Sequence, residues 1–242
     1  MDMSKPRIGI LRWEGGKVPE GLMQLERMTG NSTNPASYPF PVKMVEVKGA
    51  TTETVIIHPS REVLSRMIEI VKEMEKEGIC AVTTSCGFNA VFQKELAEAV
   101  NIPVFTSSIL QVPFVQTIIG KNHSVGIITA NKGSLTREHM RACNITDESN
   151  LYVVGLEDCR EWRKIFDEPD EPFDMEAVSA EILGAIAKGF EEHPDTAFIV
   201  LECTDLPPYA KQIRERFHVP VLDVNTMIGY MAYAIGQMKM YD

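Results

Sequence analysis

The feature of this sequence that most constrains its fold is an internal repeat with an offset of 117 residues. Several residue pairs share this spacing: Gly9 with Gly126, Cys86 with Cys203, and Pro103 with Pro220. At the same offset, a helical pattern at 61–77 falls on another at 178–191. Because these coincidences share one register, the sequence predicts a duplicated chain with two similar halves.

Each half alternates short apolar runs with longer amphipathic patterns. The runs that predict strands are 8–11, 42–47, 79–83, 104–105, 125–129, 151–154, 197–201 and 219–222. Helices are predicted between them at 61–77 and 178–191, and a last helix at 227–240 follows Asp223 and Asn225 as N-cap residues. Continuous apolar strands separated by helices are typical of parallel sheets covered on both faces. We therefore predict an α/β fold of two similar α/β domains, each a short, mostly parallel sheet flanked by helices, related by a pseudo-twofold axis.

Two segments depart from this alternation. Residues 13–41 contain four prolines and four glycines, and predict a long loop with a short helix near 23–28. Long ordered loops in compact domains often serve function. The segment 157–173 is acidic and contains proline, so we interpret it as a solvated surface connection.

Charge and cysteine content exclude several classes of protein. The formal net charge is −10, and no Lys/Arg cluster forms the basic face that nucleic-acid binding requires. The five cysteines contain no CxxC pair, which argues against a disulfide framework or a zinc site, and the histidines follow no metal-ligand spacing. The sequence shows no signal peptide and no apolar run of about 18 residues, so we expect a cytoplasmic protein that does not enter a membrane.

Cys86 and Cys203 are the candidate catalytic residues. Each ends an apolar strand and precedes a helix, and ligands of open α/β sheets bind at that edge. A helix N-terminus also lowers a thiol pKa. Thiols presented from opposite sides of one cleft can remove a proton from a carbon beside a carboxylate and return it to the other face. Buried cysteines are more often packing residues, and we interpret the remaining three in that way.

Polar residues beside these strand ends are candidates for holding the carboxylate. Hydroxyls, amides and backbone N–H groups would have to do so against the negative field of the whole chain. The candidates are Ser85, Gly87, Asn89, Thr129, Asn131 and Thr204, together with Glu14 and Asp205 as acids that orient or accept a proton near a thiol. Helix capping for the first six, and a surface position for the two acids, remain open as alternatives. Trp13 and Tyr38 are candidates for the pocket wall.

Two motifs resemble a known family. ECTDLPP at 202–208 is similar to the Cys-Thr-x-x-Pro signature of the aspartate/glutamate/hydantoin racemase superfamily, and TTSCGFNA at 83–90 matches its first cysteine motif less closely. Asn34-Pro35 resembles an element of hydantoin-type members. The resemblance implies a first domain of 1–116 plus 217–242, a second of 117–216, and a site in the cleft between them. It also implies Cys86 and Cys203 as the acid/base pair, no cofactor or metal, and a homodimer.

The departures from the family narrow the expected substrate. Gly87-Phe88 replaces polar residues, and Asp205 stands where glutamate racemases have histidine, so glutamate is disfavoured. We predict a cofactor-independent racemase or epimerase of an aspartate- or hydantoin-like carboxylate. The alternatives are a maleate-type cis-trans isomerase, an arylmalonate-type decarboxylase, and a small carboxylate-binding protein without enzymatic activity.

Overall fold

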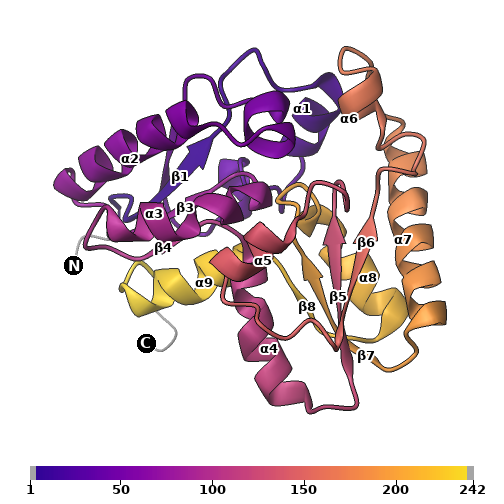
Figure 1. Ribbon diagram of the computed structural model, residues 1–242. Helices are drawn as coiled ribbons and strands as arrows, with labels where there is room; N and C mark the ends of the chain where they lie inside the picture. Colours follow the sequence, from indigo (N-terminus) through magenta and orange to yellow (C-terminus); the bar gives the residue numbers. More distant parts are fainter. Residues whose placement is uncertain (1–3, 239–242) are drawn as a thin grey trace.

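The computed structural model describes residues 4–238, which form two four-stranded sheets whose neighbouring strands are all parallel (Figure 1). The first sheet has the order β2-β1-β3-β4 and the second the order β6-β5-β7-β8. The strands are β1 (Ile8–Arg12), β2 (Val42–Glu46), β3 (Ala81–Thr84), β4 (Val104–Phe105), β5 (Ser124–Thr129), β6 (Leu151–Gly155), β7 (Thr196–Leu201) and β8 (Val221–Leu222). Each strand thus has a counterpart at the same place in the other sheet, which confirms the two similar halves.

Helices connect and cover these strands. The α-helices are α1 (Glu20–Glu26), α2 (Arg61–Lys76), α3 (Gln93–Glu98), α4 (Val112–Ile119), α5 (Arg137–Ala142), α6 (Lys164–Asp167), α7 (Met175–Glu192), α8 (Ala210–Phe217) and α9 (Val224–Ala234). Shorter helical turns are η1 (Pro35–Ser37), η2 (Glu53–Ile57), η3 (Gly87–Phe92), η4 (Ser108–Gln111) and η5 (Pro207–Tyr209). The predicted final helix begins earlier than expected, after the N-cap Asp223, and its predicted end at Met240 lies outside the described residues.

The repeated glycines mark places where a side chain packs directly on a strand. A Cβ atom at Gly9 would lie 2.6 Å from the sulfur of Met74 on α2, and one at Gly126 would lie 2.7 Å from the Tyr152 ring. Every residue of β3 and β5 is buried, as expected for sheets covered on both faces. The sequence repeat therefore records close packing at the centre of each sheet.

Each half passes its last helix to the other half. α4 follows β4 of the first sheet but contacts β5 and β7 of the second, whereas α9 follows β8 of the second sheet and packs on the first. Figure 1 shows α4, in magenta, beside the second sheet, and α9, in yellow, beside the first. The predicted domain boundaries remain a prediction. They return the chain to the first domain at residue 217, whereas β8 follows that residue and belongs to the second sheet.

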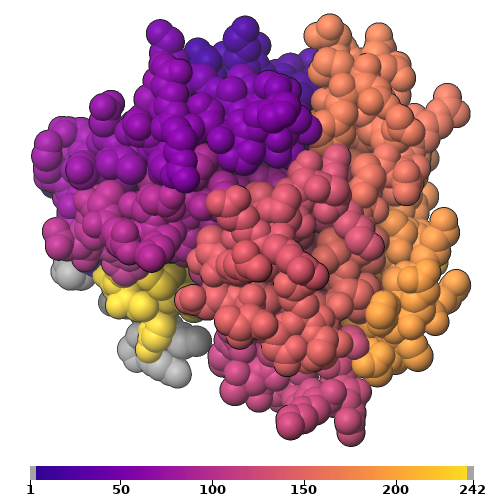
Figure 2. Space-filling model, in the orientation of Figure 1, coloured from indigo at the N-terminus to yellow at the C-terminus, as the bar shows by residue number. Residues whose placement is uncertain are grey.

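The two irregular segments meet above the carboxyl ends of the strands. The backbone N–H of Glu20 donates to the carbonyl of Pro169 (2.8 Å), and Gln24 exchanges hydrogen bonds with the backbone of Phe173. Figure 2 shows the indigo and orange segments in contact at the top of the molecule. The interpretation of 157–173 as a solvated connection was wrong, because Trp162 is fully buried and packs against Phe173. The apolar side chains of this segment are few, and its many acids dominate its composition.

Among residues 4–238, no helix combines the length and apolar character needed to cross a membrane.

Candidate active site

Cys86 and Cys203 lie at the carboxyl ends of β3 and β7 and line the same cavity. Both are buried, with exposed fractions of 8% and 9%. Cys86 is the N-cap residue of η3, and the chain after Cys203 turns into η5. The strand ends therefore bring the two predicted thiols together, as ligand sites of parallel sheets require.

The cavity is small and closed over by the two irregular segments. Its volume of about 30 Å³ has room for one or two water molecules. Its lining consists of Trp13, Val18, Leu22, Glu26, Ile56, Ser85, Cys86, Gly87, Phe88, Ala130, Trp162, Ile165, Phe166, Cys203, Thr204 and Asp205. α1 and the segment of α6 supply the apolar roof, so a larger ligand enters only if these segments move.

Cys203 is paired with an acid. Its thiol donates to Oδ2 of Asp205 across 3.7 Å, and Oδ1 of Asp205 accepts a hydrogen bond of 2.7 Å from Asn31. Burial raises the pKa of the Asp205 carboxyl to about 7, and the Asn31 hydrogen bond opposes that rise. Burial, Asp205 and Glu202 together raise the pKa of Cys203 well above its ordinary value. The proton of this pair is consequently held on sulfur.

Cys86 has N–H donors in place of an acid. Burial and the nearby Glu202 raise its pKa well above the ordinary value, and the backbone N–H of Phe88 and the indole N–H of Trp13 offset only part of that rise. The Trp13 nitrogen is buried and has no acceptor in ordinary hydrogen-bond geometry among the described residues. Donors that face a sulfur favour its thiolate. The backbone N–H of Asp205 acts on Cys203 in the same way, so the difference between the two thiols is that, among the described residues, only Cys203 has a carboxyl as its hydrogen-bond partner.

The turns that carry the two cysteines pack against each other. The Thr204 hydroxyl donates to the backbone carbonyl of Ser85 (2.5 Å). Gly87 lies against Glu202, whose Oε2 accepts a hydrogen bond of 2.7 Å from Thr129. These contacts fix the cysteine turns of the two halves relative to each other.

The structure gathers half of the predicted substrate-binding residues at the cavity. Ser85, Gly87, Thr204 and Asp205 line it. The other four lie elsewhere: Glu14 accepts from the N–H of Gly49, Asn89 donates its N–H to the carbonyl of Cys86, Thr129 bonds Glu202, and Asn131 accepts from the N–H of Ser134. Trp13 is in the wall, whereas Tyr38 bonds Ser32 and Asn225 away from it.

Several functional candidates escaped sequence reasoning. Glu26, Phe88, Trp162 and Phe166 line the cavity from α1, η3 and the segment of α6. Asn31 and Glu202 act on the thiols from behind it. The only sequence feature that could have identified any of them is that Glu202 and Phe88 lie within two residues of a cysteine in the chain. Nothing in the pattern placed the other four against the strand ends.

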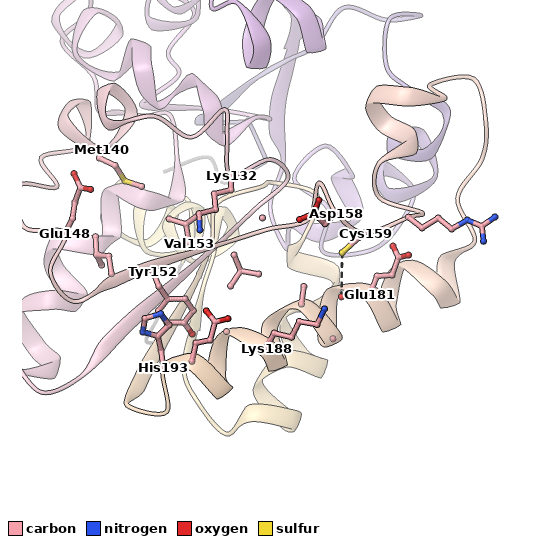
Figure 3. A pocket seen from close by; sticks show the side chains of 18 residues that line it. Lys132, Met140, Glu148, Tyr152, Val153, Asp158, Cys159, Glu181, Lys188 and His193 are labelled. Atoms are coloured by element: carbon pink, nitrogen blue, oxygen red, sulfur yellow. Dashed lines mark hydrogen bonds between the residues drawn. The ribbon is translucent and has the colours of Figure 1, made fainter.

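A large surface hollow lies away from Cys86 and Cys203, over β6 and α7 (Figure 3). Its volume is about 870 Å³, and Lys132, Lys188, Glu181 and Glu192 give it charges of both signs. The sulfur of Cys159, one of the lining residues, lies 4.0 Å from the Glu181 carbonyl. Within the described residues, no three His, Cys, Asp or Glu side chains are arranged to hold a metal ion.

Comparison with known proteins identifies the family. The Asp/Glu/Hydantoin racemase family matches residues 50–231, which include Cys86 and Cys203, the whole second sheet, and β3 and β4 of the first. The chain belongs to this family. An allantoin racemase from Pseudomonas fluorescens has a similar fold, with a TM-score of 0.62 and 16% identity over 97% of this chain and 94% of that one. The resemblance predicted from the two cysteine motifs is confirmed, and membership places the chain among enzymes.

The curated proteins that this chain resembles include lyases. A dimethylsulfoniopropionate lyase of Durusdinium sp. clade D is 31% identical over 81% of this chain and 66% of its own length. Dimethylsulfoniopropionate lyase 3 of Emiliania huxleyi is 27% identical over 93% of this chain and 59% of its own length. The chain spans about half to two thirds of the length of its curated relatives.

The prediction of a racemase or epimerase is contradicted by these relatives. None of the alternatives weighed from the sequence was a lyase that releases a sulfide. The physical reason is that racemisation and elimination can begin with the same step, removal of a proton beside a carboxylate. Whether the deprotonated substrate is reprotonated or eliminates then depends on whether the substrate has a leaving group, and the cysteine motifs do not indicate this.

Proposed function

We propose that this chain is a lyase that acts on 3-dimethylsulfoniopropionate or a close analogue, releasing dimethyl sulfide and acrylate. The substrate class comes from the curated relatives and from the character of the cavity. A thiol base beside the substrate supplies the chemistry that such an elimination needs.

The observation that carries this proposal is the lining of the cavity. Glu26 and Asp205 contribute carboxyl groups, and four aromatic rings lie beside them: Trp13, Phe88, Trp162 and Phe166. None of the lining residues that the structure describes is Lys, Arg or His, and the Arg12 guanidinium, 3.7 Å from the Glu26 carboxyl, stands outside the lining. Aromatic faces and carboxylates attract cations, and a methylated sulfonium is such a cation. The predicted anion site is thus better suited to a substrate that also carries a positive charge.

In the proposed reaction, the Cys86 thiolate removes a proton from carbon 2 of the substrate. The electron pair of that C–H bond becomes the double bond between carbons 2 and 3. The bond from carbon 3 to sulfur breaks, and its electrons stay on sulfur. Dimethyl sulfide therefore leaves as a neutral molecule without needing a proton, acrylate remains, and Cys86 later returns its proton to water.

Cys86 is assigned as the base because of the donors around it. The N–H groups of Phe88 and Trp13 stabilise negative charge on its sulfur, whereas Cys203 faces the carboxyl of Asp205. Cys203 and Asp205 hold a proton on the opposite wall, and Asp205 supplies negative charge toward the sulfonium when ionised. Ser85 also lines the cavity and is the candidate for holding the carboxylate, because the Thr204 hydroxyl is already engaged with the carbonyl of Ser85.

The test is direct turnover of 3-dimethylsulfoniopropionate, with dimethyl sulfide measured by headspace gas chromatography and acrylate by NMR. Both products are expected in equal amounts from the wild type and from Cys143→Ser, whose buried thiol lies outside the cavity lining. Cys86→Ser should fall to background. Wild-type release no faster than that of Cys86→Ser would overturn the proposal.

A further inference from the structure

Glu202 is a buried carboxyl group that the proposed elimination does not use. It is fully buried, directly precedes Cys203, and does not line the cavity. Oε2 accepts a hydrogen bond of 2.7 Å from Thr129, and Oε1 has no partner among the described residues. A buried, half-satisfied carboxyl is costly, so its retention at this place calls for a physical reason.

The unpaired oxygen of Glu202 lies against the turn of Cys86. A Cβ atom built at Gly87 would stand 2.2 Å from Oε1 and 2.2 Å from the backbone carbonyl of Glu202. No real side chain tolerates such contacts, so position 87 requires glycine, because of both the backbone and the carboxyl of Glu202. The carboxyl occupies the space that a side chain next to Cys86 would fill.

The sequence repeat shows what this pair replaces. The offset of 117 residues aligns Ser85 with Glu202 and Gly87 with Thr204. In one direction across the two halves, the Thr204 hydroxyl donates to the carbonyl of Ser85. In the reciprocal direction, position 87 has no hydroxyl, and the carboxyl of Glu202 takes its place. The contact from the second half to the first thus uses an uncharged hydroxyl, whereas the equivalent contact involves the ionisable carboxyl of Glu202.

The carboxyl is close enough to several thiols to influence them. Negative charge on Glu202 raises the pKa of Cys86, of Cys203 and of Cys143, which lies at the end of α5. Burial raises the pKa of Glu202 itself to about 7, with a smaller contribution from Asp205, against the Thr129 hydrogen bond. These three thiols, Asp205 and the Thr129 hydroxyl are the groups through which its charge acts.

We propose that Glu202 is a positioning residue that controls when Cys86 releases its proton, by packing against the Cys86 turn in the space left by Gly87. While Glu202 is neutral, it supports the turn and leaves the thiolate undisturbed. When Glu202 is ionised, its charge opposes the thiolate. For activity this inference rests on the proposed function, whereas the reactivity of Cys86 tests it without any substrate.

The test is the pH dependence of Cys86 alkylation by iodoacetamide, followed by peptide mass spectrometry in the full chain. Glu202→Gln keeps the shape of the side chain and removes its charge. The midpoint pH for Cys86 alkylation should fall by about one unit, so alkylation below the midpoint should be about tenfold faster. Glu98→Gln, an exposed glutamate on α3, is the matched control and should leave the midpoint unchanged.

A second variant separates charge from packing. Glu202→Ala removes both the charge and the packing of the carboxyl against the Cys86 turn. It should therefore lower the midpoint as Glu202→Gln does, and it should also lower the thermal stability, which Glu202→Gln should affect less. A midpoint within about 0.2 units of wild type in Glu202→Gln, roughly a fifth of the expected charge effect, would overturn the inference and leave Glu202 a packing residue. A shifted midpoint without dimethyl sulfide release would instead contradict only the proposed lyase function.

Discussion

The two halves of the molecule share a sheet order and a strand-end cysteine, yet differ in what surrounds that cysteine. In the first half, N–H groups of Phe88 and Trp13 face the thiol of Cys86. In the second, the thiol of Cys203 donates to a carboxyl group. Duplication thus supplied a symmetric frame, and later differences made the two thiols unequal. An elimination with one base and a neutral leaving group can use two unequal thiols. Unlike racemisation, it does not require proton transfer at both faces of the same carbon.

The largest expected effect comes from removing each thiol in turn. Cys86→Ser should lower kcat/KM for dimethyl sulfide release by about 10³-fold or more, because it deletes the base. Cys203→Ser should cost about 10- to 100-fold, since it disturbs the pair with Asp205 but leaves the base in place. The measurement is steady-state kinetics by headspace chromatography. Equal losses of kcat/KM in the two variants would mean that the two thiols contribute equally, and would contradict the assignment of Cys86 as the base.

Neutralising the acid of the second half should have the next largest effect. The pKa of Asp205 is raised to about 7, so its carboxyl becomes charged as the pH rises through 7. Asp205→Asn should lower kcat/KM by about tenfold above that pH and flatten the rise of activity between pH 6 and 8. A profile of kcat/KM against pH checks this. An unchanged rise in the variant would show that another group titrates there.

Ligand charge offers a way to compare the contributions of the two halves to binding. 3-(Trimethylammonio)propionate carries a cation, whereas 4,4-dimethylpentanoate has the same shape without one. The cation should inhibit about tenfold more tightly, and Glu26→Gln should reduce that ratio about threefold through the first half alone. Inhibition constants of both compounds give the ratio. Equal inhibition by the two would argue against a cation site.

The smallest effect concerns stability. Burial raises the pKa of Glu202 and of Asp205 to about 7 in the folded state, compared with about 4 in an unfolded chain. Their stabilising effect is therefore complete below about pH 4 and is lost as the pH rises through 7. Between pH 5 and 8, Tm should fall about 5 °C less in Glu202→Gln than in wild type. Calorimetric scans at both pH values measure this, and parallel slopes would mean that the carboxyl is not buried in solution.

The sequence predicted the two-sheet fold and the two cysteines of the site, but not most of the residues that line the cavity. All eight strands were predicted because apolar runs report burial directly, and the repeat singled out Cys86 and Cys203. The roof was missed because Trp162 and Phe166 lie in a segment whose acids suggest exposure. Glu202 was missed because no repeated pattern in the sequence distinguishes a glutamate that precedes a strand-end cysteine. Its contact with Gly87 is visible only in the three-dimensional structure.

The exchange of α4 and α9 has a consequence for the origin of the chain. Each sheet is covered in part by a helix that belongs, by sequence, to the other half. A single half would leave apolar strand surface bare and would carry one thiol, so it could neither fold well nor form this cavity alone. Two copies that traded their last helices would solve both problems. The present chain has the architecture of such a helix-swapped dimer joined into one polypeptide, and cleaving the link between the halves should leave fragments that fold only together.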